Sequence, residues 1–491
     1  MKKKKILALF LSAAMVTSVL TGCGVQTTEE AGETSETSET EETTAVEETT
    51  EPAEIAGEGT ETIDVLIYAQ EHEKVVYEDL VAKFTEEHKD TIKEVNFEVT
   101  TQEEYATKMM AAITANDLPD IFYVGPEAVR SYVDNGYVLP LDDLVDAEAV
   151  DNLWPAISSA YKYDGSTIGQ GSLYCLPKDL SCFAFAYNKD LFDEAGLEYP
   201  DPENPYTYDE FIEVCKALTK DTDGDGEIDQ WGVANANAFG FTPYVYSNGG
   251  RLLNEDYTKV QVAENEKFKE AFQFYADLTV KEKITPTVEQ DTALGGYQRW
   301  LDGQIGFYAC GTWDVAAFMD DATFPYEWDL CGWPVGPSGD GRSTTWLGTV
   351  GFAVSSTSEN PELCAELIKS LSTDLDGQKA LCGETTGKSL QLPNIMDYAQ
   401  STFKEKVADG TIPYASNVDV IFGYVEGNDK YNGIFGETTY TYNSEWWDIF
   451  LEGMPNVLTG KISVDDYCNE VQPKMQKALD NAIELQNAAT N

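Results

Sequence analysis

In the first part of the folded chain, a strand-like run of apolar residues is followed by apolar residues at helical spacing. Residues 62–69 form an apolar, β-rich run, and residues 75–88 then place apolar side chains at helical spacing. The same succession returns as a strand at 95–101, a helix at 103–116 and a strand at 118–126. Strands that alternate with helices predict an α/β fold with a mostly parallel sheet wrapped by helices.

Ligands of such sheets bind beyond the carboxyl ends of the strands. The segments in that position are 69–72, which follows the first strand, and 124–127, which follows the third. The sequence therefore predicts a binding site at this edge of the sheet.

A calcium-like loop lies between a helix predicted at 207–219, which a Thr207–Glu210 capping box begins, and a strand predicted at 230–236. In "DTDGDGEIDQWG" (221–232), three aspartates alternate, a glycine follows, and a further aspartate takes the ninth place of an EF-hand loop. Gly232 stands at the twelfth place, where an EF-hand has a bidentate glutamate.

A helix–loop–strand context favours a structural Ca²⁺ and argues against a calcium sensor. We expect side-chain oxygens from the aspartates and a backbone carbonyl from the glutamate, so the predicted metal ligands are Asp221, Asp223, Asp225, Glu227 and Asp229. The alternative is a solvated acidic turn without a metal.

The N-terminus has the pattern of an export signal. Lysines 2–5 precede an apolar run at 6–20, which is too short to span a bilayer, and "LTGC" (20–23) resembles the lipobox of bacterial lipoproteins. We expect a signal peptide at 1–22 and lipidation of Cys23, which would hold the protein at the outer face of the cell membrane. The alternative is a cleaved signal with a chance cysteine.

Residues 23–62 are expected to form an acidic linker rich in Thr, Ser and Glu. The segment has no Lys or Arg and almost no large apolar residue, so it cannot bury enough surface to fold. It would act as a tether that lifts the folded body off the membrane.

Composition restricts the function further. The chain has 491 residues and a formal net charge of −55, which disfavours nucleic acid as a partner. It has only two histidines and lacks HExxH and GxSxG motifs, so zinc hydrolysis and Ser-His-Asp chemistry have no support. With 87 carboxylates, glycoside hydrolysis stays open.

Eight cysteines besides Cys23 are scattered without a CxxC pair or metal-ligand spacing. We expect most of them to be small buried hydrophobic residues. Three tryptophan settings stand out from the core: Trp313 in "GTWD", Trp346 among small residues, and the pair Trp446–Trp447 at the start of an amphipathic helix. Flat aromatic faces suit sugar rings, although each of these residues is equally compatible with a place in the core.

Several stretches, in order, resemble the extracellular solute-binding proteins of family 1, the sugar-capturing subunits of ABC importers. They are "LPDIFYV" (118–124), "LPKDLSCFAFAYNKDLFDEAGL" (176–197), "TYDEFIEVCKALT" (207–219), "RWLDGQIGFYACGTWDVAAF" (299–318), "GFAVSSTSENPELCAELIKSLST" (351–373) and "LTGKISVDDYCNEV" (458–471). Ile305 and Gly306 depart from the small residues common in the family.

The resemblance implies a two-lobed periplasmic-binding-protein-like fold of type II, with hinge strands between lobes that close on a ligand. Lobe one would comprise 63–180 and 335–372, and lobe two 181–334 and 373–491. The implied ligand contacts are Glu71, His72, Tyr123, Glu127 and Trp346 in lobe one, and Asn237, Phe239, Trp313 and Trp447 in lobe two. The position of an acidic binding-site residue of the family is occupied by Ser181 in this chain. The network of hydrogen bonds to the sugar's hydroxyl groups must therefore differ.

We therefore expect a monomeric, lipid-anchored binding subunit, without enzymatic activity, that passes a carbohydrate to ABC-importer permease subunits. The body has four arginines and none at an implied contact, which favours a neutral oligosaccharide. A glycoside-cleaving lipoprotein and a binder of a non-sugar solute remain the alternatives.

Overall fold

Two mixed β-sheets form the framework of the protein. The computed structural model describes residues 53–234, 237–320 and 322–489, with the side chains of 53, 54 and 237–239 left out of the description. The first sheet has the strand order β1 (Ala53–Ala56), β3 (Ile92–Thr100), β2 (Glu61–Tyr68), β4 (Ile121–Val124), β13 (Gly351–Val354) and β7 (Cys175–Pro177). The second has the order β14 (Tyr431–Phe435), β12 (Ser343–Gly348), β8 (Ser181–Asn188), β10 (Ile305–Gly311) and β9 (Trp231–Val233), and β11 (Trp328–Cys331) also pairs with β8.

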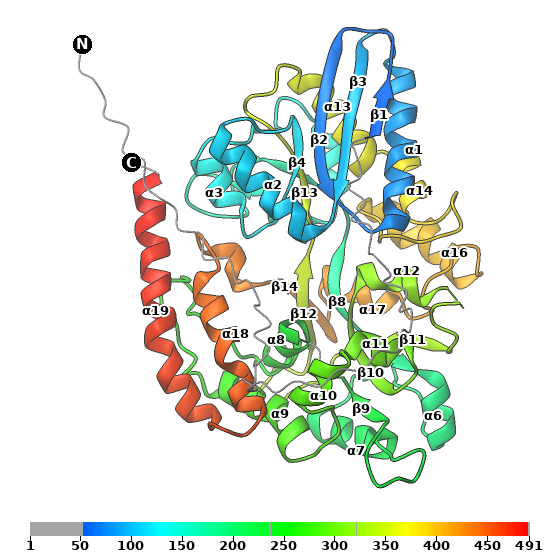
Figure 1. The fold of residues 1–491 in the computed structure, drawn as a ribbon, viewed down its shortest axis with the longest axis vertical. Helices are drawn as coiled ribbons and strands as arrows, with labels where there is room; N and C mark the ends of the chain where they lie inside the picture. Colours follow the sequence, from blue (N-terminus) through cyan, green and yellow to red (C-terminus); the bar gives the residue numbers. More distant parts are fainter. Residues whose placement is uncertain (1–52, 235–236, 321, 490–491) are drawn as a thin grey trace, which may run out of the picture. The chain divides into compact units, whose positions relative to one another are not determined.

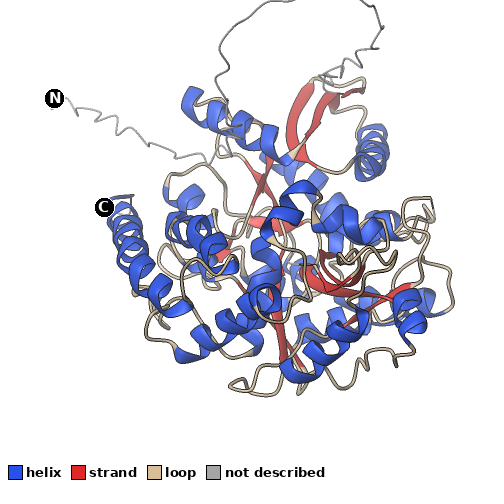
Figure 2. Cartoon of the chain, turned by 60° about the horizontal axis from the view of Figure 1, so that its bottom comes forward, coloured by secondary structure: helices blue, strands red, loops and turns tan. Residues whose placement is uncertain are grey.

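Helices surround both sheets (Figures 1 and 2). The long ones are α1 (Glu71–Glu87), α2 (Gln102–Ala115), α7 (Tyr208–Leu218), α8 (Asn237–Ser247), α9 (Glu266–Val280), α13 (Pro361–Ser372), α18 (Glu445–Leu458) and α19 (Val464–Ala489). Shorter helices include α3 (Val129–Asp134), α6 (Lys189–Ala195), α10 (Val288–Ala293), α11 (Gly296–Leu301), α14 (Leu375–Leu381), α16 (Lys404–Ala408) and α17 (Asp419–Glu426). No helix in the described ranges is both long and apolar enough to cross a bilayer.

The sheets are mixed, whereas the sequence predicted mostly parallel ones. The β2–β3, β2–β4, β9–β10 and β12–β14 pairs are parallel, as strand–helix–strand units require. Strand β8 runs antiparallel to β10, β11 and β12, and β13 runs antiparallel to β4 and β7. These antiparallel pairs arise because β8 and β13 follow directly on segments that pass between the sheets.

The predicted elements of the first sheet are present with small shifts. Helix α1 begins at Glu71, four residues earlier than expected, because Gln70 and Glu73 form a capping box in which Glu73 Oε2 accepts the Gln70 N–H at 3.0 Å. The capping box predicted for α7 is confirmed, with the Glu210 N–H donating to Thr207 Oγ1 at 3.3 Å.

Two expected boundaries differ from the structure. Residues 53–56, expected in the linker, form edge strand β1, whose alternating "AEIA" pairs with β3. The expected lobe-one segment 335–372 is divided between the sheets, because β12 belongs to the second sheet and β13 to the first. The boundaries of the two lobes stay a prediction. The expected signal peptide and Cys23 lie outside the described residues.

Each sheet has its own hydrophobic core. Ile63, Ile67, Phe97, Ile121 and Phe352 belong to the cluster around the first sheet. The larger cluster around the second sheet includes a stack of Phe185 between Phe307 and Trp333, at centroid distances of 5.1 and 4.3 Å. The eight described cysteines are buried and are not joined in disulfide bonds, as expected for small hydrophobic residues.

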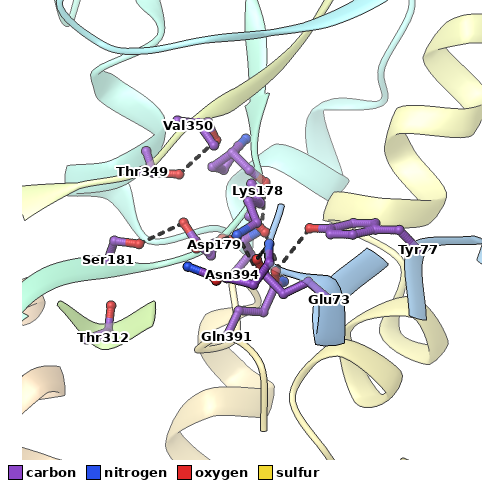
Figure 3. A network of polar contacts seen from close by, with 12 residues as sticks. Glu73, Tyr77, Lys178, Asp179, Ser181, Thr312, Thr349, Val350, Gln391 and Asn394 are labelled. Atoms are coloured by element: carbon purple, nitrogen blue, oxygen red, sulfur yellow. Dashed lines mark hydrogen bonds and ion pairs between the residues drawn. The ribbon is translucent and has the colours of Figure 1, made fainter. Parts of the chain in front are cut away.

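Two of the places where the chain passes between the sheets are adjacent. Residues 178–180 join β7 to β8, and Thr349 and Val350 join β12 to β13. The Lys178 N–H donates to the Val350 carbonyl at 2.7 Å, so the two passages lie side by side. Figure 3 shows the polar contacts that surround them.

A buried ion-pair cluster ties helix α1 to these passages. Lys178 Nζ donates to Glu73 Oε1 at 2.7 Å and lies 3.4 Å from Asp179 Oδ2, and all three side chains are buried (Figure 3). Asn394 Nδ2 donates to the backbone carbonyls of Pro177 and Lys178, and Gln391 Nε2 donates to the same Lys178 carbonyl. Glu73 therefore both begins α1 and compensates the cation at the passage.

We predict that Lys178→Met destabilises the protein by about 3–5 kcal/mol, because it leaves Glu73 and Asp179 buried without a cation. Urea unfolding measures the change. The matched control is Lys83→Met, which breaks an exposed pair with Glu87 and should cost less than about 1 kcal/mol. Equal effects of the two variants would show that the cluster does not stabilise the fold.

Candidate functional site

An aromatic pocket with a volume of about 200 Å³ lies where the loop after β4 approaches the second sheet. Pro126 and Glu127 come from that loop. The remaining lining residues come from β8, α8, the segment after α8, β12, β14, the segment that joins β14 to α18, and α18: Phe183, Thr242, Tyr246, Leu252, Trp346, Phe435, Gly436, Glu437, Thr438, Thr439, Trp446 and Trp447. We call this set the aromatic pocket.

Trp346 is fixed in the pocket by neighbours on two sides. Its indole stacks on Phe183 with a centroid distance of 4.4 Å and an interplanar angle of 18°. It also lies over Gly348, where a Cβ atom would be 1.6 Å from the ring. Trp346 belongs to the second sheet, although the resemblance placed it in lobe one.

The two tryptophans of α18 both line the pocket but differ in burial. Trp446 is 1% exposed and donates from Nε1 to Thr441 Oγ1 at 3.1 Å, which fixes the start of the helix. Trp447 is half-buried and stacks on Phe450 at 5.5 Å and 11°. The predicted contact residue Trp447 thus lines the pocket with its side chain oriented by the helix.

Trp313 lies beside the pocket and is not part of its lining. It forms part of the 3-10 turn η1 (Thr312–Asp314) after β10, and its ring covers Gly311, where a Cβ would be 2.0 Å away. Its ring meets Phe183 edge-on at 6.2 Å. Since Phe183 also contacts Trp346, the three rings form one continuous aromatic surface.

Glu127, a predicted contact, reaches the pocket from the first sheet. Its carboxylate folds back over Gly125, and a Cβ at that glycine would be 2.1 Å from Oε1. The side chain keeps contact with solvent, yet the dense protein around it desolvates the carboxylate and raises its pKa.

Three other predicted contacts from the first sheet do not line the pocket. Glu71 and His72 form the first turn of α1 and not a loop, and burial lowers the pKa of His72. Tyr123 is 2% exposed and packs against Tyr68 and Phe352. Its strand, β4, is buried on both faces, so the side chain belongs to the core in this conformation.

Helix α8 contributes to the pocket at positions that the sequence did not single out. The predicted contacts Asn237 and Phe239 begin this helix, but their side chains lie outside the description. Thr242 and Tyr246, further along α8, line the pocket. Thr242 Oγ1 is buried and has no hydrogen-bond partner among the described residues.

Glu437 is the pocket residue that the sequence interpretation missed. It lies in the 3-10 turn η3 (Glu437–Tyr440), directly after β14, and is 5% exposed. Oε1 accepts the N–H groups of Leu252 and Leu253 at 2.9 and 2.7 Å. Burial raises the pKa of Glu437 to about 7. The rule that ligands bind beyond strand ends applies to β14 too, and it could have indicated this residue.

The acidic loop brings three of its five predicted metal ligands together. One carboxylate oxygen from each of Asp221, Asp223 and Asp225 lies within 4.8 Å of the others. Asp229 instead accepts hydrogen bonds from Thr222, at 2.9 Å from N and 2.7 Å from Oγ1. The ligand expected from Glu227 is its backbone carbonyl, which stays a prediction. The triad offers hard oxygen donors, which suit a divalent cation such as Ca²⁺ or Mg²⁺.

Comparisons with known proteins agree with this architecture. The chain is 25% identical over 282 residues to the diacetylchitobiose binding protein DasA of Streptomyces coelicolor, covering 57% of this chain and 62% of that protein. It is 24% identical over 228 residues to a maltotriose-binding protein of Pyrococcus abyssi, covering 46% and 44% of the two chains. The chain thus spans about half to two thirds of the length of these relatives.

A solved structure shares the fold over most of the chain. The ABC substrate-binding protein Lmo0181 from Listeria monocytogenes, in complex with cycloalternan, superposes with a TM-score of 0.71 at 20% identity and covers 85% of this chain and 99% of that one. This likeness confirms the two-lobed α/β periplasmic-binding-protein fold expected from the sequence.

The family match covers more than half of the chain. Residues 68–374 match the family described as bacterial extracellular solute-binding protein, whose members are binding receptors and not enzymes. This confirms the resemblance seen in the sequence, and the chain therefore belongs to the bacterial extracellular solute-binding proteins.

Proposed function

We propose that this protein is the substrate-binding subunit of an ABC importer and captures a carbohydrate in the aromatic pocket. The observation that carries the proposal is the lining itself, in which tryptophan and phenylalanine rings stand beside two carboxylates, Glu127 and Glu437. Aromatic faces suit the C–H faces of sugar rings, and carboxylates accept hydrogen bonds from hydroxyl groups. The names of the relatives, which refer to diacetylchitobiose and maltotriose, support the same ligand class.

The charge of the pocket supports a neutral oligosaccharide. No Lys, Arg or His lines the pocket in the described part of the chain. An anionic sugar would meet two carboxylates without a bidentate arginine to bind it. A volume of about 200 Å³ is below the roughly 300–1,000 Å³ of sites for whole drug-sized ligands, so the pocket would hold one part of an oligosaccharide.

Closure of two lobes would complete the site. The pocket takes residues from the first sheet and from the second, so a bound ligand would bridge both. A ligand that contacts both sides binds the closed arrangement better and shifts the population toward it. Under this proposal the predicted contacts Glu71, His72, Asn237, Phe239 and Trp313 would adjoin the ligand's outer rings, and Tyr123 would support Glu127 from β4.

We also propose that the protein acts as a monomer at the outer face of the cell membrane, held by lipid on Cys23. The short apolar run before "LTGC" supports the lipidation, and the acidic segment after it supports a tether. The permease subunits of the importer would receive the sugar there. Mass spectrometry of the mature N-terminus tests the anchor.

A binding screen tests the carbohydrate proposal. N,N′-diacetylchitobiose, maltotriose and cycloalternan are titrated into the folded protein, together with a glycan array that carries neutral and uronate-containing oligosaccharides. Binding of an intact neutral glycan supports the proposal. Binding of none of the glycans, with a thermal shift from peptides or polyamines, would show that the solute is not a sugar.

We predict that Trp447→Ala weakens binding of the glycan found in this screen by roughly 1–3 kcal/mol, because it removes an oriented aromatic face from the pocket. Isothermal titration calorimetry measures the loss. The control is Tyr297→Ala, which removes an exposed aromatic ring that does not line the pocket and should leave the affinity unchanged. Unchanged affinity in folded Trp447→Ala would remove Trp447 from the site.

We further propose that the acidic loop binds one structural Ca²⁺ through Asp221, Asp223 and Asp225, with the Glu227 carbonyl and Asp229 as the further ligands expected from the EF-hand pattern. The Asp221 carboxylate already accepts the N–H groups of Gly224 and Gly226, which holds the loop curved around the triad. The loop joins α7 to β9, so a bound ion would stabilise these two elements.

We predict that a calcium chelator lowers the melting temperature and leaves the glycan affinity, measured below the melt, unchanged. The reason is that an ion that binds only the folded state stabilises it by mass action. Differential scanning calorimetry with and without chelator gives the shift, and Asp223→Ala should abolish it. A melting curve that the chelator does not move, with no calcium in elemental analysis, would leave the loop as a solvated acidic turn.

A further inference from the structure

One oxygen of Glu437 is held by the protein and the other is left for a ligand. The two backbone N–H groups of Leu252 and Leu253 both donate to Oε1. Oε2 is buried and has no hydrogen-bond partner among the described residues. A buried carboxylate oxygen without a donor is costly, and such an atom in a native structure calls for an explanation.

The charged and titratable neighbours of Glu437 do not supply the missing donor. Arg251 lies close enough to lower the pKa of Glu437, but its guanidinium donates to the Gly250 carbonyl and lies 5.0 Å from the centroid of the Tyr246 ring. Burial, and to a smaller extent the charge of Glu437, raises the pKa values of Tyr246 of α8 and Tyr257 of the segment before α9. Glu127 faces the same pocket from the first sheet and only accepts hydrogen bonds when ionised.

A second unpartnered group lies in the same pocket. Thr242 Oγ1 is buried and lacks a partner in the described ranges. Thr242 on α8 and Glu437 on η3 thus both bring open hydrogen-bonding capacity to a pocket rich in aromatic side chains. A ligand group that enters the pocket meets a fixed acceptor and a rotatable hydroxyl group.

We propose that Glu437 determines the ligand by accepting a hydrogen bond through Oε2 from a hydroxyl group of the sugar ring in the aromatic pocket. The inference rests on the proposed carbohydrate function and deepens it. The bound ring would be neutral and would present a free hydroxyl group to Glu437. A ring that presents a carboxylate or a fully substituted edge to Glu437 would be disfavoured.

The hydrogen bond has a consequence for the pH dependence of binding. Burial raises the pKa of Glu437 to about 7 in the free protein. A donor on the ligand favours the ionised carboxylate, so the pKa of Glu437 falls when the ligand is bound. Affinity should therefore be constant above pH 7 and decrease below it, by up to about tenfold per pH unit until the pKa of the bound form is reached.

The test uses the full folded protein and the neutral glycan array of the preceding section, with titrations at pH 5.5 to 8.5 for N,N′-diacetylchitobiose and maltotriose. Glu437→Gln keeps an oxygen for the Leu252 and Leu253 N–H groups and replaces Oε2 by an amide that donates. We expect at least a tenfold loss of glycan affinity at pH 8 and no decrease toward pH 6. The matched control is Glu445→Gln, on the exposed first turn of α18.

Stability separates a ligand role from a structural one. Glu437→Gln removes a buried charge that is ionised above pH 7, so the melting temperature of the ligand-free protein should not fall. A lower melting temperature with unchanged glycan affinity would overturn the inference, because it would make Glu437 a structural residue.

Two further outcomes distinguish the inference from the proposed function. Wild-type protein that binds neutral glycans with the same affinity at pH 5.5 and 8 overturns the role of Glu437 alone, even if the variant does not fold. Wild-type protein that binds no glycan on the array overturns the carbohydrate function, and the inference with it.

Discussion

The pairing of Lys178 with Glu73 is the contact on which the arrangement of the two sheets depends. Lys178 lies in the short segment that leaves the first sheet for the second, and its backbone N–H bonds to the other passage at Val350. The same Glu73 carboxylate caps α1. A buried cation with excellent partners is stable, whereas a separated one is strongly unfavourable. Motion between the sheets is therefore expected to turn around this cluster and to leave its ion pairs intact.

The aromatic surface of the pocket depends on glycines as much as on tryptophans. Trp346 and Trp313 each fold over a glycine two residues away, Gly348 and Gly311, where any Cβ would overlap the ring. Phe183 then contacts both rings. The indoles are consequently fixed before a ligand arrives, which reduces the ordering cost of binding. Trp313 follows its glycine with the spacing G-x-W, whereas Trp346 precedes its glycine with the spacing W-x-G.

Features set by neighbouring residues were predictable from the sequence, and features set by distant ones were not. The Thr207–Glu210 capping box and the α/β succession of the first sheet follow from local patterns. The family resemblance indicated Glu127 and Trp447, which line the pocket. The bonds of Glu437 to Leu252 and Leu253 join residues more than 180 positions apart, and no periodicity indicates such a contact. Tyr123 was placed at a strand end, but continuous burial of β4 makes it a core residue.

Edge strand β1 also determines where mechanical load enters the folded body. It pairs antiparallel with β3 and has no other strand beside it in the described part of the chain. Any tension carried by the preceding residues reaches the first sheet at Ala53, so the β1–β3 hydrogen bonds are loaded before any others. The aromatic pocket and the Lys178 cluster contain no residue of β1. If the preceding residues act as the proposed tether, detachment of this strand would lengthen it by a few residues and leave the aromatic pocket intact.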